Sequence, residues 1–327
     1  MKQIALGSQG LIVPVQGLGA MGMSAFYGAR DDVESAATLN RAVDLGVTLI
    51  DTAEIYGPFL NERLIGRVLG PRRGEITIAS KFAREVFDDG TFGPVNGSPA
   101  YARKALERSL VNLGTDVIDL YYMHRMDPKI PIEETMGALS EFVQEGKIRY
   151  IGLSEAAPET IRRAHAVHPV TAVQTEYSLF ERSPEENGVL KTVRELGIGF
   201  VAYSPLSRGF LSGAITKLSD FADDDFRRHV PRFSEANFGE NLKLVDLVRA
   251  MAVDKGVTPS QLALAWLQAQ GVVAIPGTKR RSYLEENAAA AELELDAAEI
   301  AQLSSIIPGS AVQGARYDEA GMRSTYL

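Results

Sequence analysis

The sequence predicts an α/β protein, a (β/α)8 TIM barrel with an N-terminal β-hairpin and a long loop after strand 7. Two observations predict this fold. Short β-branched or apolar runs alternate with segments of helical period, and the alternation continues almost end to end through the 327 residues. No linker rich in Pro and Ser interrupts it, so one closed barrel explains the pattern better than two open sheets. We therefore expect a single domain over residues 1–327.

The expected strands follow in chain order. Residues 3–6 and 11–13, joined by a glycine-containing turn, predict a small hairpin ahead of the barrel. The glycines of segment 17–22 are interpreted as the turn after the first barrel strand. Short apolar runs predict the other barrel strands, at residues 48–50, 76–78, 117–121, 150–153, 171–173, 200–202 and 272–275.

Segments of helical period lie between these strands, at residues 32–45, 100–113, 132–145, 158–168 and 189–196. Several are followed by a glycine, the residue that most readily ends a helix in the left-handed conformation, at Gly46, Gly114, Gly146 and Gly197. Residues 207–240 interrupt the alternation with a long polar and aromatic stretch. Loops of that length in compact domains are usually functional lids or disordered.

The composition excludes several kinds of partner and site. Lys and Arg total 34 against 42 Asp and Glu, a net charge of -8, which disfavours nucleic acid and anionic lipid partners. The chain has neither a run of about 20 apolar residues nor an apolar leader, so we expect a cytoplasmic protein. With no Cys and four His that lack metal-ligand spacing, we expect no metal site. Redox chemistry would require an organic cofactor, and the oligomeric state stays open.

Polar residues follow the predicted strands where each strand ends. In a barrel of this type, the carboxyl ends of the strands form the rim on which the chemistry is built. The residues at these positions are Asp51, Lys81, His124, Ser154, Gln174 and Tyr203, with Tyr56 a short distance beyond Asp51. Four of them suit carbonyl reduction: Asp51, Tyr56, Lys81 and His124.

Carbonyl reduction needs a hydride at carbon and a proton at oxygen, from a donor whose pKa is near the working pH. A free phenol, with a pKa of about 10, is too weak. Lowering it to about 7 or 8 takes about 3–4 kcal/mol, which one ammonium about 4 Å away supplies at an effective dielectric constant of about 20. Lys81 is therefore expected to activate Tyr56 as the acid. Asp51 would hold Lys81 charged, and His124 would orient the carbonyl oxygen.

Three of these residues have a structural explanation when each is taken alone. Asp51 could cap the next segment, Lys81 could be a solvated charge, and Tyr56 could pack. Their joint occurrence at strand ends favours the catalytic interpretation.

A glycine pattern supports an alternative architecture. Segment 17–22, Gly-Leu-Gly-Ala-Met-Gly, matches the dinucleotide fingerprint of a doubly wound sheet, with Asp44 at the distance of the ribose acid. That fingerprint passes directly from strand to helix, whereas residues 23–30 are loop-like and helical period begins near Asp32. We therefore favour the barrel.

Over essentially its full length, the chain resembles the aldo-keto reductase family. The matching motifs are LIDTAEIYG at 49–57 with Asn61-Glu62, Lys81, His124, QTEYS at 174–178, AYSPLSRG at 202–209, and IPGTKR at 275–280 with Glu286-Asn287. The resemblance implies reduction of a small aldehyde or ketone with NADPH/NADP+ as the cofactor. It also supports the same four catalytic residues.

The resemblance implies a cofactor site along the rim. Ser154 and Gln174 would bind the nicotinamide carboxamide, and Tyr203 would stack on the nicotinamide ring. The loop 204–211 would wrap the pyrophosphate, and residues 277–281 would hold the adenosine 2′-phosphate. The full set implied is Gly19, Met21, Ser154, Gln174, Tyr203, Ser204, Pro205, Leu206, Arg208, Gly209, Leu211, Ile275, Pro276, Gly277, Thr278, Lys279, Arg280, Arg281, Glu286 and Asn287.

The basic run Lys279, Arg280 and Arg281, in an otherwise acidic chain, predicts NADPH over NADH, with the residue that contacts phosphate left open. Two positions depart from the family pattern. Glu155 stands where many relatives have Asn, and Tyr283 where other branches have an Arg for the 2′-phosphate. An ionised Glu155 cannot donate a hydrogen bond, so carboxamide binding then rests on Ser154 and Gln174.

Two other functions occur in proteins with a barrel of this kind. The alternative is a cofactor-sensing regulatory subunit of the potassium-channel beta type, which the four catalytic residues disfavour without excluding. A barrel hydrolase lacks support from a metal set or a carboxylate pair. Variable loops are expected to build the substrate pocket, around Met21, Phe26, Phe82, Met126 and residues 311–327.

Overall fold

Eight parallel strands form the centre of the molecule in the computed structural model, which describes residues 1–223 and 225–327. Their bounds are β3 (Leu18–Gly19), β4 (Leu49–Asp51), β5 (Thr77–Phe82), β8 (Ile118–Met123), β9 (Ile148–Ser154), β10 (Ala172–Glu176), β11 (Gly199–Tyr203) and β12 (Val273–Ala274). Parallel bridges from Gln16 to Ala274 and from Gly19 to Gly277 join the first strand to the last. The predicted (β/α)8 barrel is confirmed, and the doubly wound alternative is wrong.

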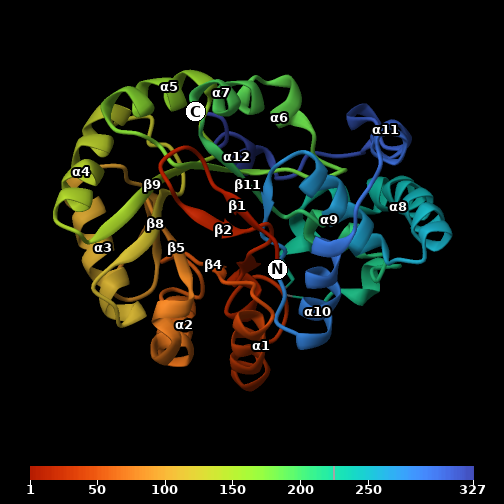
Figure 1. The fold of residues 1–327 in the computed structure, drawn as a ribbon, viewed down its shortest axis with the longest axis horizontal. Helices are drawn as coiled ribbons and strands as arrows, with labels where there is room; N and C mark the ends of the chain where they lie inside the picture. Colours follow the sequence, from red (N-terminus) through yellow and green to blue (C-terminus); the bar gives the residue numbers. More distant parts are fainter. Residues whose placement is uncertain (224) are drawn as a thin grey trace.

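Helices surround these strands (Figure 1). They are α1 (Asp32–Asp44), α2 (Leu60–Leu69), α3 (Pro99–Leu113), α4 (Ile132–Gln144), α5 (Pro158–Val167), α6 (Ser183–Glu186), α7 (Val189–Leu196), α8 (Glu235–Lys255), α9 (Pro259–Ala269), α10 (Arg281–Ala289), α11 (Ala297–Ile306) and α12 (Glu319–Met322). The five predicted helices are present, and the four glycines that follow them have positive φ. In the described part of the chain, no helix has the length and apolar character to span a membrane.

The predicted hairpin closes one end of the barrel, and in Figure 1 it lies in front of the strands. It consists of β1 (Gln3–Ala5) and β2 (Ile12–Pro14), which pair antiparallel. Leu6 and Val13 pack in one buried cluster with Leu49 and other barrel side chains. The N–H of Ser8 donates to the carbonyl oxygen of Gly197, just ahead of β11 (2.8 Å). The hairpin therefore covers the amino-terminal ends of the strands.

The glycine-rich segment 17–22 differs from the prediction. Gly19 lies in the first barrel strand and Gly17 directly precedes it, so neither belongs to a turn after that strand. A Cβ at Gly17 would lie 2.8 Å from the carbonyl oxygen of Leu49, and one at Gly19 would lie 2.9 Å from that of Ile275. Glycine is required because the first strand is confined between its two neighbours where the barrel closes.

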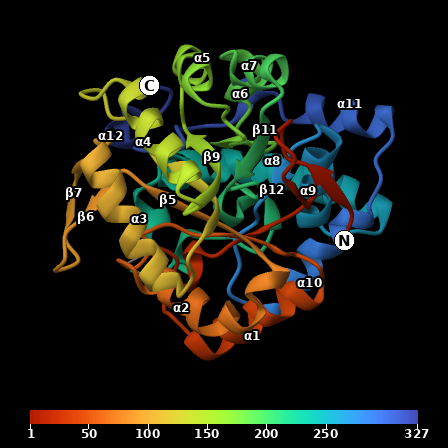
Figure 2. The same cartoon turned by 60° about the vertical axis from the view of Figure 1, so that its left-hand side comes forward.

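Two insertions enlarge the opposite, carboxyl-terminal end. A hairpin of β6 (Arg84–Val86) and β7 (Phe92–Val95) follows β5 and lies at the edge of the molecule near α3 (Figure 2). The long loop predicted after the seventh strand is present and contains short 3-10 turns until α8 begins at Glu235. The C-terminal segment also returns to this end, where the N–H of Tyr326 donates to the carbonyl oxygen of Glu155 (2.7 Å).

Candidate active site

A cleft of about 1120 Å³ opens at the carboxyl ends of the strands. The predicted residues that line it are Gly19, Met21, Asp51, Tyr56, His124, Ser154, Gln174, Tyr203, Ser204, Pro205, Leu206, Arg208, Gly209, Ile275, Pro276, Gly277, Thr278, Lys279, Arg280, Glu286 and Asn287. Within the described residues, no cluster of three or more His, Asp or Glu side chains could hold a metal ion.

Some predicted residues do not line the cleft. Lys81 is fully buried directly behind Tyr56, to which it bonds. Leu211 is buried in the hydrophobic core, and Arg281 is exposed on the surface. Of the side chains expected around the substrate, Met21 and Phe26 line the cleft, whereas Phe82 and Met126 do not. Phe82 is instead buried with its ring stacked on Tyr121, at 5.2 Å between ring centroids.

The Lys81 ammonium connects the catalytic candidates, because each of its three donors has a different acceptor. It donates to Asp51 Oδ1 at 2.5 Å, to the carbonyl oxygen of Thr52 at 2.8 Å and to the hydroxyl oxygen of Tyr56 at 3.5 Å. Since the phenol oxygen accepts from Lys81, its own O–H is free to donate elsewhere. The geometry thus presents a phenolic proton to the cleft.

The electrostatics of Tyr56 differ from the sequence prediction. Burial, and after it the charge of Asp51, raises the pKa of Tyr56 well above its usual value of 10.0. Burial also lowers the pKa of Lys81, although Asp51 opposes that change. The prediction compared a lone ammonium with an exposed phenol, whereas here the carboxylate of Asp51 offsets the ammonium and burial dominates. Without a cofactor, Tyr56 is a fully protonated phenol at neutral pH.

His124 is a neutral imidazole in this site. Burial, then the charges of Arg125, Lys81 and Arg84, lower the pKa of His124 well below 6.5. Its Nδ1 is buried with no hydrogen-bond partner among the described residues. An unpaired acceptor is less unfavourable than an unpaired N–H, which assigns the proton to Nε2. The His124 ring lies edge to face with that of Tyr56, with 6.0 Å between the ring centroids. The Tyr56 hydroxyl and His124 Nε2 are therefore two hydrogen-bond donors in the same region of the cleft.

The two residues expected to bind the carboxamide, Ser154 and Gln174, line the cleft and contact other side chains of the protein. Gln174 Nε2 donates to Asp51 Oδ2 at 2.8 Å, so its side-chain oxygen remains available as an acceptor. The Ser154 hydroxyl lies 3.4 Å from an Arg125 guanidinium nitrogen.

The departure at Glu155 is explained by the C-terminal segment. Arg316, whose side chain is buried, donates to both carboxylate oxygens of Glu155 (2.5 and 2.9 Å). Burial alone would raise the pKa of Glu155, but the charge of Arg316 outweighs it and lowers that pKa. The Tyr203 hydroxyl also donates to Glu155 (2.8 Å) and lies 3.0 Å from the Tyr317 hydroxyl. This network fixes the Tyr203 ring and ties the C-terminal segment to the rim.

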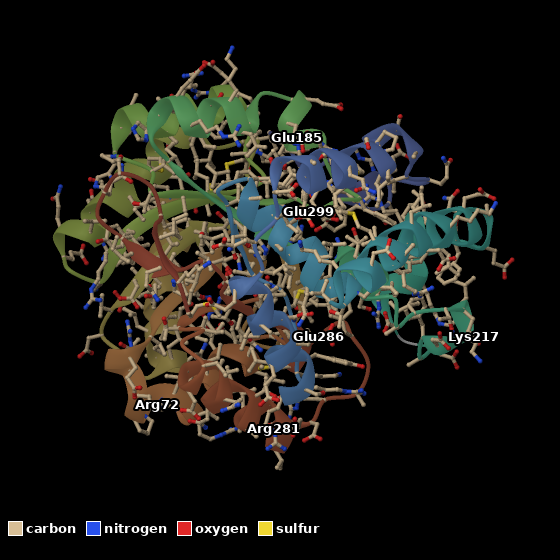
Figure 3. All side chains as sticks on the ribbon, turned by 45° about the vertical axis from the view of Figure 1, so that its right-hand side comes forward. Arg72, Glu185, Lys217, Arg281, Glu286 and Glu299 are labelled. Atoms are coloured by element: carbon tan, nitrogen blue, oxygen red, sulfur yellow. The ribbon has the colours of Figure 1, made fainter. Side chains whose placement is uncertain are left out.

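The three basic residues after the last strand have different partners. Arg281 pairs with Glu34 at 3.0 Å, and Figure 3 shows Arg281 and Glu286 on the same helix, α10. Lys279 donates to two carbonyl oxygens, those of Tyr27 and Ala29 (2.6 and 2.7 Å). The exposed Arg280 guanidinium forms no hydrogen bond or ion pair with any residue that the structure describes.

Sequence reasoning missed several residues of the cleft. Arg84, Arg125 and Tyr317 line it, and Arg316 fixes its rim through Glu155. Arg125 directly follows His124, so the strand-end argument extended by one position would have found it. No local pattern links Arg316 to Glu155, which is 161 positions earlier in the chain.

Comparisons with known proteins agree with this geometry. The model of the Aldo/keto reductase family matches residues 17–308. A glycerol dehydrogenase from Gluconobacter oxydans is 28% identical with a TM-score of 0.85, over 94% of this chain and 96% of that chain. The thermostable aldo-keto reductase Tm1743, in complex with epalrestat, is 32% identical with a TM-score of 0.77, over 94% of this chain and 100% of that chain.

An aldo-keto reductase from Klebsiella pneumoniae, in complex with NADP and acetate, is also similar. It is 27% identical with a TM-score of 0.75, over 97% of this chain and 99% of that chain. The family match, the barrel and the arrangement of its rim lead to one conclusion: the chain belongs to the aldo/keto reductase family and is an oxidoreductase.

Proposed function

We propose that the protein reduces aldehydes or ketones with NADPH, with Tyr56 as the general acid. The proposal rests on the two contacts of the Lys81 ammonium, which donates a hydrogen bond to Asp51 and another to the hydroxyl oxygen of Tyr56. When bound, NADPH supplies the hydride that adds to the carbonyl carbon. Tyr56 donates the proton to the carbonyl oxygen, so the products are an alcohol and NADP+.

Each neighbour of Tyr56 has a separate task. The Lys81 ammonium stabilises the phenolate that remains after proton transfer, and Asp51 keeps that ammonium charged in a buried site. His124 donates a second hydrogen bond from Nε2 to the carbonyl oxygen, which polarises the bond before hydride arrives. The high pKa of Tyr56 ensures that the acid carries its proton at neutral pH.

The described residues fit a dinucleotide phosphate. Ser204, Ser207 and Arg208 have positive φ (47°, 48° and 56°), tight turns of the kind that present backbone N–H groups to phosphate oxygens. The N-cap residue of α10 makes no side-chain cap, and the N–H of Arg281 donates instead to the Glu34 carboxylate (3.1 Å), as expected of a helix start that favours anions.

The same end of the cleft supports a preference for the 2′-phosphate. Arg280 is free to bind it, and Lys279 adds a second positive charge. Glu34 neutralises Arg281, so we assign the main contact to Arg280.

The test is consumption of NADPH, with NADH in parallel, against aliphatic, aromatic and cyclic carbonyl compounds. We expect turnover of at least one class and a lower KM for NADPH than for NADH. Tight NADPH binding without turnover of any class would contradict a reductase and support the cofactor-sensing alternative.

A further inference from the structure

Two arginines stand at the catalytic end of the cleft. Arg84 begins the hairpin just beyond β5, the strand that carries Lys81, and Arg125 directly follows His124 at the end of β8. Both line the cleft together with Tyr56. Each cation is therefore within three residues of a proposed catalytic residue at the same strand end.

Neither arginine forms an ion pair with a carboxylate of residues 1–223 or 225–327. Every other buried or half-buried arginine in the described part of the chain forms an ion pair, as Arg208 and Arg316 do at the same rim. The Arg84 side chain forms no hydrogen bond or ion pair with a described residue. Arg125 donates to the carbonyl oxygen of His124 at 2.7 Å and reaches two hydroxyls only at 3.4 Å.

The two charges act on the same small region. After burial, Arg125 is the next cause that lowers the pKa of Arg84, and both arginines contribute to the low pKa of His124. The two guanidiniums repel each other and lose hydration in a half-buried cleft. Burial would lower the pKa of Arg125, but Tyr317, Tyr203 and Glu155 outweigh it and raise that pKa, so the uncompensated charge is mainly that of Arg84. An anion held between them would relieve both penalties, and the site stands out in a protein whose net charge is -8.

The backbone conformation of the residue before Arg84 indicates that the surrounding structure holds Arg84 in its position. Ala83 is fully buried and has φ +81°, which a residue with a Cβ rarely adopts. Such a conformation costs about 1–3 kcal/mol and persists where the surrounding structure requires it, often at functional sites. The carbonyl oxygen of Ala83 accepts from the N–H of Asn96 (2.9 Å), which secures the turn from β5 into the hairpin.

We propose that Arg84 and Arg125 form a subsite for a carboxylate or phosphate group of the substrate, so that the preferred carbonyl compounds are anionic. The subsite is distinct from the basic run 279–281, which follows a different strand. A planar guanidinium binds carboxylate or phosphate oxygens through paired, charge-assisted hydrogen bonds. This inference rests on the proposed reductase function and assigns the substrate class of that site.

The experiment compares matched carbonyl pairs with the holoenzyme. The carboxylate arm uses 4-carboxybenzaldehyde against methyl 4-formylbenzoate, and the phosphate arm uses glyceraldehyde 3-phosphate against glyceraldehyde. We expect at least one anionic partner to have a kcat/KM higher by about tenfold to a hundredfold, through a lower KM. The preference should weaken as salt is added. Equal kcat/KM for charged and neutral partners in both arms would overturn the subsite.

Variants link the preference to the two side chains. In Arg84→Met and in Arg125→Met, the ratio of charged to neutral kcat/KM should fall towards one. Arg103→Met is the matched control, because it removes the same charge from a helix outside the cleft, where Arg103 pairs with Glu145. A preference that survives in Arg84→Met, or that Arg103→Met abolishes equally, would contradict the assignment.

Failure of the reductase function is distinguishable from failure of the subsite. If no carbonyl compound is turned over, calorimetry of the protein with NADP+ tests the subsite with inert probes. Benzoate should then bind more tightly than benzamide, and Arg84→Met should remove the difference. Equal binding of the two probes would overturn the subsite whatever the catalytic result.

Discussion

The two ends of the barrel are built on different principles. At the amino-terminal end, Leu6 and Val13 of the hairpin pack against Leu49 and other apolar strand residues in a buried cluster. At the carboxyl end, the buried positions include charged groups, with Asp51 and Lys81 almost fully excluded from solvent. Apolar burial stabilises the first end, whereas each buried charge at the second requires a partner. The difference separates the part that holds the barrel together from the part that performs chemistry.

The backbone shows the same contrast. Glycines supply the positive φ after helices at the amino-terminal end, as at Gly114 and Gly197. In loops that follow strands, residues with side chains also adopt it, among them Ala83, Glu155 and Arg208, and no such residue has positive φ in a described loop that follows a helix and leads into a barrel strand. Conformational strain is therefore concentrated where side chains must be aimed at the cleft.

The largest expected combined loss of activity and stability comes from a substitution at the carboxyl end. Lys81→Met removes the ammonium from the Tyr56 oxygen and leaves Asp51 buried without its ion pair. We expect kcat to fall by about 10²- to 10³-fold and the free energy of unfolding to fall by about 3–5 kcal/mol. Steady-state kinetics and denaturant unfolding measure the two effects.

A double variant separates chemistry from folding at that position. Asp51→Asn combined with Lys81→Met removes both charges, so most of the lost stability should return while kcat stays low. Recovery of kcat in the double variant would show that Lys81 has only a structural role.

The next largest effect is a loss of stability caused by a substitution at the amino-terminal end. Leu6→Ala removes a side chain that is 1% exposed, which should lower the free energy of unfolding by about 2–5 kcal/mol. Below the unfolding temperature, kcat/KM should be unchanged. Ile12→Ala, at a position 56% exposed on the same hairpin, is the control and should leave stability almost unaltered. Loss of kcat/KM in folded Leu6→Ala would show that the two ends are coupled.

A smaller effect tests which arginine binds the 2′-phosphate of NADPH. Arg280→Ala should weaken NADPH binding by about tenfold to a hundredfold and leave NADH binding unchanged, because only NADPH has the 2′-phosphate. Arg281→Ala should have little effect, since Arg281 pairs with Glu34. Fluorescence titration of both cofactors measures this, and the reverse order of the two variants would contradict the assignment.

The smallest expected effect is that of pH on reduction, because no change is expected over a wide range. The pKa of Tyr56 is raised, so the phenol keeps its proton as pH rises, and the pKa of His124 is lowered, so the imidazole stays neutral as pH falls. The kcat for reduction should therefore be flat from about pH 7 to about 9, whereas alcohol oxidation needs deprotonated Tyr56 and should rise about tenfold per pH unit. A reduction profile that falls above about pH 8 would require a lower pKa for Tyr56 in the complex.

The sequence predicted the regular parts of the molecule and a large part of the rim. Apolar runs and terminal glycines sufficed for seven of the eight barrel strands, the N-terminal hairpin and five helices, because those features depend on neighbouring residues alone. Gly17 and Gly19 were assigned to a turn because their need for close strand approach arises only when the barrel closes. The pairing of Arg316 with Glu155 and the placement of Arg84 depend on tertiary contacts and had no local signal. The single-domain assignment stays a prediction.

The most direct test of the central claim compares two phenols in the cleft. Burial would raise the pKa of Tyr317, but the charges of Arg208 and Arg125 outweigh it and lower that pKa, the opposite of Tyr56. Single-turnover hydride transfer from NADPH should slow by about 10²- to 10⁴-fold in Tyr56→Phe with cofactor affinity retained, and by about tenfold or less in Tyr317→Phe. A Tyr56→Phe variant that transfers hydride at the wild-type rate would contradict the account.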